Sequence, residues 1–416
     1  MDGKQSILDH PEAQAILADA ILDEAQLARL GGALGPFLER YLPLLQRSEQ
    51  RHNARLVLLG KLSSLSRKTC EPIAHHFGVR REALQDFVGS SPWDDEALAA
   101  EVRRHVAEEW PDPEGVLTVD GSAFPKKGTH SCGVERQWCG RLGQVGNCQV
   151  GVFVGYACRH GHALLDRRLF LPKGWAKDGE RRKQTHTPKE VGYQESWQIA
   201  LGLLGRCRDA PHGWVTADDE FGQVQELRAA LRERGERYLV DVPSNTLVRD
   251  LDARPPVQAR RRGWPPKQPF ETVAAWAARQ AAARWEEVEV GPGEKGPIRV
   301  RAITARVQTR WHGSKLGPQE RLLVRRDGEG KVSYHLSNTG REGTAEVLAR
   351  VRARHHEVER CFQEGKGEVG LGHYEVRSWV GWHHHMTLTM LALWFLALTR
   401  HRERGGKSGA DGGRAA

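Results

Sequence analysis

The stretch V-L-T-V-D-G-S-A-F-P-K-K-G, residues 116–128, decides the fold class of this 416-residue chain. Its first four residues, Val116–Val119, are apolar or β-branched and predict a buried strand, which Gly121 and Ser122 are expected to end. Asp120 therefore stands where a buried strand ends. This position suits a carboxylate that binds a hard cation, although an Asp before a Gly is also a common turn residue.

A second apolar run that ends in acids is G-W-V-T-A-D-D-E-F-G, residues 213–222. One of its acids, Asp218, Asp219 or Glu220, could be a second metal ligand at the end of a neighbouring strand. All three could instead form an acidic helix start, because helical periodicity follows over Gln223–Arg234 and carboxylates stabilise helix N-termini.

A third acid, Glu359, lies on a predicted amphipathic helix. Residues that favour a packed face recur there at helical spacing, namely Val347, Leu348, Val351, His355, Val358 and Phe362. Arg352, His355, Glu359 and Lys366 fall on one side of this helix. Such a stripe suits a metal-binding carboxylate beside a phosphate backbone, but it is also the pattern of a solvated charged face.

The order of the elements from Gly115 predicts an α/β layer. Strands and helices alternate over Val116–Val119, Val150–Ala157, Ala163–Phe170, Glu195–Arg206 (helix), Trp214–Ala217, Gln223–Arg234 (helix) and Tyr238–Val242. The interval from Asp218 to Glu359 is too long for an ordinary connection. It contains a basic linker, a predicted helix and three strand-like runs: Arg254–Pro269, Glu271–Arg284, Ile298–Gln308, Arg321–Arg325 and Val332–Leu336.

The chain before Pro111 is predicted to be helical. Leu27–Leu45 has an amphipathic pattern that Gly31, Gly32 and Pro36 interrupt, and W-D-D-E-A-L from Trp93 predicts a capped helix start. The segment Glu71–Val88 has the spacing of a helix-turn-helix with Gly78 at the turn. Its second helix would present Arg80, Arg81 and Gln85 to DNA, whereas an ordinary helical hairpin explains the pattern equally well.

Composition narrows the class of protein. The formal net charge is +9 and the isoelectric point is near 9.3, which suits a polyanionic partner. The longest apolar run, Met386–Leu398, is too short to span a bilayer and predicts a buried helix, and no secretory signal opens the chain.

The cysteines and a run of histidines offer weaker metal hypotheses. Seven cysteines without a C-x-x-C pair indicate reduced thiols, and a zinc site at Cys132 and Cys139 is the less favoured interpretation. Consecutive residues of a helix point in different directions, so His383–His385 are expected to pack or to contact phosphate rather than to bind a metal together.

Several blocks, in order, resemble bacterial insertion-sequence transposases of the DDE class, in particular the insertion sequence 701 family, a relative of the insertion sequence 4 group. The resemblance extends from about Leu56 to Thr399. It rests on V-D-G-S-A-F-P-K-K-G, S-C-G-V-E-R-Q-W-C-G, N-C-Q-V-G-V-F-V, D-R-R-L-F-L-P-K-G-W, Asp218-x-x-Phe221-Gly222 and G-L-G-H-Y-E-V-R-S-W.

This resemblance implies a domain organisation. A helical DNA-binding domain with a helix-turn-helix would occupy residues 1–112, and a ribonuclease-H-like catalytic domain would occupy 113–244 and 340–402. A β-rich insertion before the last catalytic helix would occupy 245–339. Beyond the resemblance, the Gly-rich composition of residues 403–416 predicts a disordered tail.

The resemblance also implies catalytic residues and cofactors. The catalytic and metal-binding acids would be Asp120, Asp218 and Glu359, with Asp218 preferred to Asp219 because it keeps the spacing to Phe221 and Gly222. They would hold two divalent ions, Mg²⁺ with Mn²⁺ as a substitute.

Five basic residues would contact DNA phosphates: Lys126, Lys127, Arg352, His355 and Lys366. The related group has a Tyr and an Arg where this chain has Arg352 and His355. A His at the second position could bind phosphate as a cation only when it is protonated.

The implied activity is cleavage and strand transfer of DNA. Double-stranded DNA, as transposon ends and target, would be the partner of a homodimer that acts without a membrane, in the bacterial cytoplasm at the nucleoid. Two alternatives are a transposase-derived DNA-binding regulator without catalysis and a nuclease that has lost strand transfer.

Overall fold

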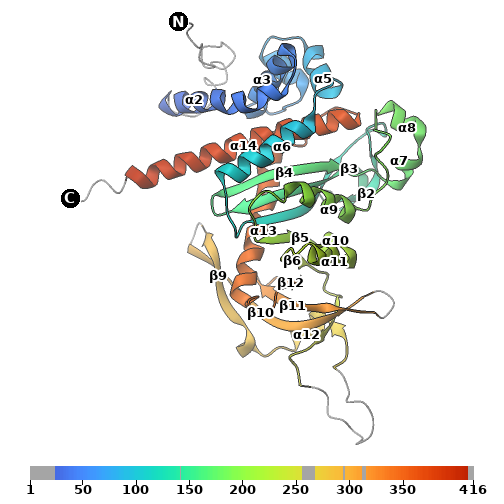
Figure 1. Ribbon diagram of the computed structural model, residues 1–416, viewed down its shortest axis with the longest axis vertical. Helices are drawn as coiled ribbons and strands as arrows, with labels where there is room; N and C mark the ends of the chain where they lie inside the picture. Colours follow the sequence, from blue (N-terminus) through green and yellow to red (C-terminus); the bar gives the residue numbers. More distant parts are fainter. Residues whose placement is uncertain (1–23, 141, 255–267, 294–295, 312–314, 411–416) are drawn as a thin grey trace, which may run out of the picture.

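The computed structural model describes residues 24–140, 142–254, 268–293, 296–311 and 315–410. Most of the predicted linker Arg254–Pro269 lies outside these residues. A large mixed sheet forms the centre, with helices of the N-terminal part at one end of the molecule and the strands that precede the last two helices at the other (Figure 1).

The N-terminal part is helical, as predicted. Its elements are α2 (Glu24–Tyr41), η2 (Leu42–Leu44), α3 (Ser48–Leu62), α4 (Cys70–His76), α5 (Arg81–Gly89) and α6 (Asp95–Glu109). Helix α2 continues through Pro36, so the predicted interruption is wrong. The apolar face formed by Phe37, Leu38 and Tyr41 is buried, and this packing offsets the hydrogen bond that proline cannot make.

Helices α4 and α5 are joined by a short turn at the predicted position. Gly78 lies in this turn with a φ of 65°, in the left-handed region that favours glycine. Leu84, Phe87 and Val88 of α5 are buried, whereas Arg80, Arg81 and Gln85 are exposed. The two helices and the turn thus have the predicted places, while DNA contact by α5 stays a prediction.

The central strands have the order β2-β3-β1-β5-β6, with β4 also paired to β3. Strand β1 pairs antiparallel with β3 and parallel with β5, and β5 pairs parallel with β6. This mixed α/β arrangement is consistent with a ribonuclease-H-like fold. The strands are β1 (Val116–Pro125), β2 (Glu135–Cys139), β3 (Gln144–Cys158), β4 (Gly161–Leu169), β5 (Trp214–Ala217) and β6 (Tyr238–Asp241).

Helices surround these strands. They are α7 (Lys173–Lys177), α8 (Gly179–Gln184), α9 (Ser196–Cys207), α10 (Asp219–Gly222) and α11 (Gln225–Glu233). The Gly121-Ser122 pair predicted that the first strand ends at Val119, but β1 continues past this residue. Its ladder with β3 continues from Asp120, opposite Phe153, to Pro125, opposite Cys148, because the long partner strand supplies hydrogen bonds beyond β5.

The strands between β6 and the last two helices belong to the same sheet. Strand β12 pairs antiparallel with β6, and β11, β10, β7 and β8 follow it in space. The elements are β7 (Leu247–Asp250), β8 (Glu271–Thr272), α12 (Val273–Ala278), η3 (Ala282–Arg284), β9 (Glu286–Gly293), β10 (Gly296–Arg310), β11 (Leu316–Arg326) and β12 (Val332–Ser337). The helix predicted over Glu271–Arg284 is therefore limited to α12 and the short η3.

Two long helices complete the chain, α13 (Ala345–Gly367) and α14 (Trp379–Ala410). The run Met386–Leu398 lies largely buried within α14, as predicted. Helix α14 continues to Ala410 and residues 411–416 lie outside the described part, so the disorder expected for residues 403–416 stays a prediction.

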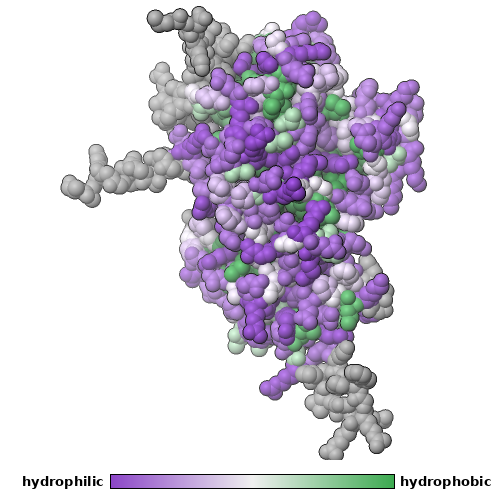
Figure 2. Space-filling view, viewed as in Figure 1, coloured by the Kyte–Doolittle hydropathy of each residue, from purple (hydrophilic) through white to green (hydrophobic). Residues whose placement is uncertain are grey.

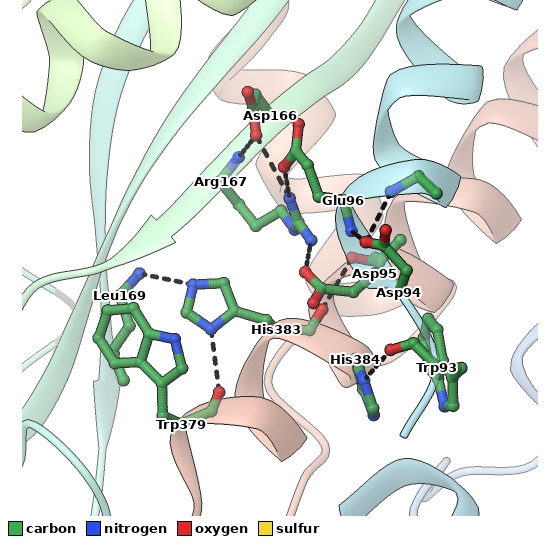
Figure 3. A network of polar contacts seen from close by, with 12 residues as sticks. Trp93, Asp94, Asp95, Glu96, Asp166, Arg167, Leu169, Trp379, His383 and His384 are labelled. Carbon is green, nitrogen blue, oxygen red and sulfur yellow. Dashed lines mark hydrogen bonds and ion pairs between the residues drawn. The ribbon is translucent and has the colours of Figure 1, made fainter. Parts of the chain in front are cut away.

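A buried ionic cluster joins the N-terminal helices to the sheet (Figure 3). Arg103 of α6 and Arg206 of α9 contact the Asp166 carboxylate of β4 at 3.1 and 2.7 Å. Arg167 pairs with both Asp166 and Asp95, as Figure 3 shows. Asp166 is fully buried. Burial opposes ionisation of Asp166, but the surrounding guanidinium groups outweigh it and hold its pKa below the usual value.

The run His383–His385 has the packing role that was one of its two predicted roles. All three rings are buried, and burial lowers the pKa of each. His383 donates to the Trp379 carbonyl at 2.9 Å, and the His384 ring stacks on Trp93 (Figure 3). Neutral buried imidazoles do not suit phosphate contact.

The visible surface is mostly hydrophilic, with small separate apolar patches (Figure 2). Within the described residues no helix combines the length and the apolar character that a membrane span requires.

Close packing of α13 on β3 at Gly155 gives a first prediction. A Cβ at this position would lie 2.5 Å from Val358 Cγ1. Gly155→Ala should lower the free energy of unfolding by about 1–3 kcal/mol because the helix must move away from the sheet. Chemical denaturation measures the change. Gly202→Ala is the matched control, since it meets open space on α9. Equal stability of the two variants would contradict the close approach.

Candidate active site

Asp120 and Asp218 lie at the same end of two adjacent parallel strands. The register pairs Val119 of β1 with Ala217 of β5, and each acid is the next residue. Asp120 remains in β1, now paired only with β3. The predicted meeting of these two acids therefore follows from parallel pairing, which brings equivalent strand ends to one edge.

Asp218 lies both at the end of a strand and at the start of a helix. It follows strand β5, and its carboxylate caps α10 by accepting a hydrogen bond from the Phe221 backbone nitrogen at 3.3 Å. Burial, with Glu220 and Asp219 nearby, raises its pKa to about 7. Close packing explains the glycine at position 222 of the same motif, because a Cβ there would collide with the Asp241 carbonyl oxygen of β6.

Electrostatics connects Asp120 with the other two predicted acids. Burial raises the pKa of Asp120 well above its ordinary value, and the charges of Asp218 and Glu359 raise it further, while Lys366 acts in the opposite direction. Contacts place α13 near the same edge, because His355 lies 3.1 Å from Thr216 of β5 and Lys366 lines one cleft with Asp218.

Glu359 is surrounded by basic side chains of its own helix. Its carboxylate lies 2.8 Å from His356 Nδ1 and 3.8 Å from both Arg352 Nη2 and His355 Nε2. The Glu359 side chain is 42% exposed. It is therefore held by Arg352 and by the imidazoles of His355 and His356, while part of its side chain remains accessible to solvent.

The donor set suits a hard cation. Asp120, Asp218 and Glu359 offer carboxylate oxygens, the ligands that Mg²⁺ and Mn²⁺ favour, and the raised pKa values indicate negative groups without sufficient compensating charge. In the described part of the chain, no group of three or more His, Cys, Asp or Glu side chains has a metal-binding arrangement.

The same result leaves the zinc hypothesis without support among the described residues. Cys132 Sγ instead contacts Thr187 Oγ1 at 3.2 Å, and Cys139 is buried as a free thiol.

The surroundings of His355 do not favour phosphate binding, so that role stays a prediction. His355 is 3% exposed, and its Nδ1 lies 3.1 Å from Thr216 Oγ1, which in turn lies 2.8 Å from Thr118 Oγ1. Burial, followed by the charge of Arg352, lowers its pKa to about 3. His355 is therefore a neutral, buried imidazole beneath the acids, because α13 turns this position toward β1 and β5.

The other predicted basic residues have different surroundings. Arg352 Nη2 contacts Asp241 at 3.0 Å, with only 15% of its side chain exposed, so it serves an internal ion pair. Lys126 Nζ lies 3.5 Å from the Tyr374 ring centroid, and burial lowers its pKa to about 8. Lys127 is exposed, and Lys366 is partly buried at the edge of the cleft.

A cleft of about 1130 Å³ opens beside the acids. Its walls come from β1, β2, α10, α13 and the segment after α13, and include Ser122, Gln137, Trp138, Asp218, Asp219, Glu220, Gln363, Lys366 and His373. The Trp138 side chain is 62% exposed, an unusual position for a large aromatic ring. Sequence analysis missed Trp138 because strand β2 itself was not predicted.

Asp241 is the second residue that sequence analysis missed. It ends β6 and contacts His335 Nδ1 at 2.6 Å as well as Arg352. Burial would raise its pKa, but these two partners outweigh burial and hold the pKa well below the usual value. Its signal was visible, because Y-L-V-D has the same apolar run before an acid as the segments of Asp120 and Asp218.

Two acids at adjacent strand ends, a third on α13 and an adjoining open cleft form a candidate active site in an α/β protein. Comparison with known families identifies the class of protein. The family described as DDE superfamily endonuclease matches residues 40–306, which include Asp120 and Asp218 and end before Glu359. The chain belongs to this family.

A curated relative gives a more particular resemblance. The chain is 27% identical over 251 residues to the probable transposase for insertion sequence element IS701 of Microchaete diplosiphon. The match covers 59% of this chain and 60% of that protein.

The buried position of His355 gives a second prediction. His355→Leu should lower the free energy of unfolding by about 1–3 kcal/mol, because the Thr216 hydroxyl loses a buried partner. It should leave the salt dependence of DNA binding unchanged, because a neutral imidazole releases no counterions. Denaturation and gel-shift titrations measure both quantities. His356→Leu, an exposed change on the same helix, is the control for stability, and a reduced salt slope in His355→Leu would restore the phosphate-contact role.

Proposed function

We propose that this protein is a transposase that binds the ends of its insertion sequence and catalyses metal-dependent DNA cleavage and strand transfer. The observation that carries the proposal is the meeting of Asp120 and Asp218 at adjacent strand ends, within the electrostatic range of Glu359. Membership of the DDE superfamily endonuclease family and the resemblance to a probable transposase support it.

The three acids would hold two divalent ions, most suitably Mg²⁺, with Mn²⁺ as a substitute. When bound, such ions supply an activated oxygen nucleophile and stabilise the leaving oxygen in displacement at phosphorus. The side chains of Asp120 and Asp218 contribute rigid oxygen donors, because β1 and β5 fix their backbone positions.

The neighbouring polar groups have positioning roles in this proposal. Arg352 bridges Asp241 and Glu359, so it limits where the Glu359 carboxylate can move. Neutral His355 ties α13 to Thr216 of β5 below the acids. Lys366, on the cleft side of α13, provides a positive charge that would orient a phosphate.

The cleft and the N-terminal helices provide the proposed DNA path. Trp138 exposes an aromatic face in the cleft, and aromatic faces stack on unpaired bases. Helix α5 presents Arg80 and Arg81 on a separate part of the surface, where they would bind the ends of the element. Because an element has two ends, a homodimer on double-stranded DNA would place one active site at each.

The acid triad gives a third prediction. Asp120→Asn, Asp218→Asn and Glu359→Gln should each lower the rate of Mg²⁺-dependent cleavage by at least about a hundredfold, because each removes an anionic ligand, while DNA affinity persists. Cleavage of end-bearing DNA and gel shifts measure the two effects. Asp209→Asn, on the exposed surface, is the control. Loss of cleavage in Asp219→Asn but not in Asp218→Asn would show that the neighbouring acid is the ligand.

The non-catalytic alternative has one observation in its favour. Glu359 contacts basic partners, and the described residues contain no closed metal-binding group. A regulator would bind end DNA with unchanged affinity and would not nick it with Mg²⁺ or Mn²⁺. A nuclease that has lost strand transfer would cut the end but would not join it to target DNA. A strand-transfer assay therefore distinguishes this alternative from a transposase.

Helix α5 gives a fourth prediction. The Arg80 and Arg81 side chains are 85% and 51% exposed, and Arg81 forms surface ion pairs with Glu71 and Glu82. Replacing both by Ala should weaken binding to end DNA and lower the salt slope by about one per lost phosphate contact. Arg208→Ala is the control, since this side chain is similarly exposed. An unchanged slope in the double variant would favour the plain helical hairpin.

A further inference from the structure

A second cavity lies between the N-terminal helices and α14, and it shares His373 with the cleft beside the acids. Its volume is about 210 Å³. One side is formed by α3, α4 and α5, and the other by α14 and the segment His373–Val376. Whatever binds in it would therefore contact the N-terminal helices and α14 together.

Two lysine side chains line this cavity although both are buried. Lys61 is 1% exposed and Lys68 is 6% exposed. Buried ammonium groups are normally paired with carboxylates, since an unpaired buried charge costs several kcal/mol. Within the described residues neither lysine has a carboxylate partner within 4 Å, so this pair is an exception.

The partners that the lysines do have are neutral. Lys61 Nζ donates to Thr389 Oγ1 at 2.7 Å and approaches His385 Nδ1 at 3.5 Å, and Lys68 Nζ donates to the Ser63 carbonyl oxygen. The other nitrogen of His385 lies 3.2 Å from the Leu371 carbonyl oxygen, which makes it the N–H donor and leaves Nδ1 as an acceptor. These contacts satisfy hydrogen bonds but supply no negative charge.

The remaining charged groups do not balance the lysines. Glu375 is the carboxylate that lines the cavity, and it pairs with Arg67 at 2.6 Å. Glu368 acts on Lys68 only at longer range. Burial lowers the pKa of Lys61 to about 7 and that of Lys68 to about 8, which agrees with two amines that lack a counter-anion. The Cys70 thiol is neutral there, because burial raises its pKa to about 11.

We propose that this cavity binds a phosphoryl group between the amines of Lys61 and Lys68, with Thr69 at its wall. An anion of this kind accepts several hydrogen bonds and supplies the negative charge that the two lysines lack. Its binding fastens α3–α5 to α14, so occupancy links the N-terminal helices to the rest of the molecule. The site does not depend on the nuclease activity proposed above.

Two sources supply this chemistry, a free phosphate or the terminal phosphate of a DNA strand. The test uses the full-length protein in a metal-free buffer with chelator, so that cleavage plays no part. Thermal unfolding and calorimetry are followed with inorganic phosphate at constant ionic strength. In a second arm, short oligonucleotides with a 5′-phosphate are compared with the same oligonucleotides bearing a 5′-hydroxyl.

The expected result is a Tm that rises with phosphate or with the 5′-phosphorylated oligonucleotide. Lys61→Met and Lys68→Met should each weaken that binding about tenfold or more, since each removes one charged hydrogen-bond donor. Lys173→Met, on the exposed surface, should bind as the wild type does. The Lys68 variant also keeps the test decisive should the deeper Lys61 change impair folding.

The pattern of binding identifies the source. A response to inorganic phosphate supports a free anion, and a preference for the 5′-phosphorylated oligonucleotide that both lysine variants lose supports a DNA end. The proposal is overturned by the absence of binding in both arms, or by binding that survives in both lysine variants.

Discussion

The parallel pairing of β1 with β5 is the constraint on which the site depends. It sets Val119 beside Ala217 and therefore places the next residues, Asp120 and Asp218, at one edge. Helix α13 can reach that edge only because Gly155 has no side chain where Val358 packs. Backbone pairing thus positions two acids rigidly, and close packing of a single helix against the sheet positions the third.

The site also depends on an uneven distribution of charge. Asp120 and Asp218 have raised pKa values because they are partly buried near other acids, whereas Asp241 has a lowered pKa because His335 and Arg352 neutralise it. Acids at three neighbouring strand ends therefore have different electrostatic states. The third anchors Arg352, which extends toward Glu359, whereas cation binding by the first two belongs to the proposed function.

Elsewhere buried charges connect the parts of the molecule. Asp166 joins α6, β4 and α9 through arginines, so the N-terminal helices are tied to the central sheet by a compensated cluster. The contrast with Lys61 and Lys68 is informative, because these buried charges have neutral partners. Ion pairing with arginines stabilises the buried charge of Asp166. For Lys61 and Lys68, burial favours either loss of the ammonium proton or binding of an anion.

The sequence by itself determined the local pattern. Apolar runs predicted strands β1, β3, β4, β5, β6 and β10–β12, and helical spacing predicted α9, α13 and the buried part of α14, because side-chain period reflects secondary structure directly. It also singled out Asp120, Asp218 and Glu359 as candidates, which the structure brings into one electrostatic environment. Their catalytic role is a proposal that cleavage assays must test.

Only the tertiary structure decided how these elements pair and which of their side chains become buried. Strands β7–β12 belong to the central sheet because β12 pairs with β6. This pair joins segments that lie far apart in the chain, so no local pattern predicts it. His355 and Glu359 lie on one side of α13, yet α13 buries the first against Thr216 and leaves the second partly open. Helical spacing gives the direction in which a side chain leaves the helix axis. Its burial, protonation state and partners depend instead on what packs against that side of the helix. For His355 that partner is Thr216, more than a hundred positions away in the chain.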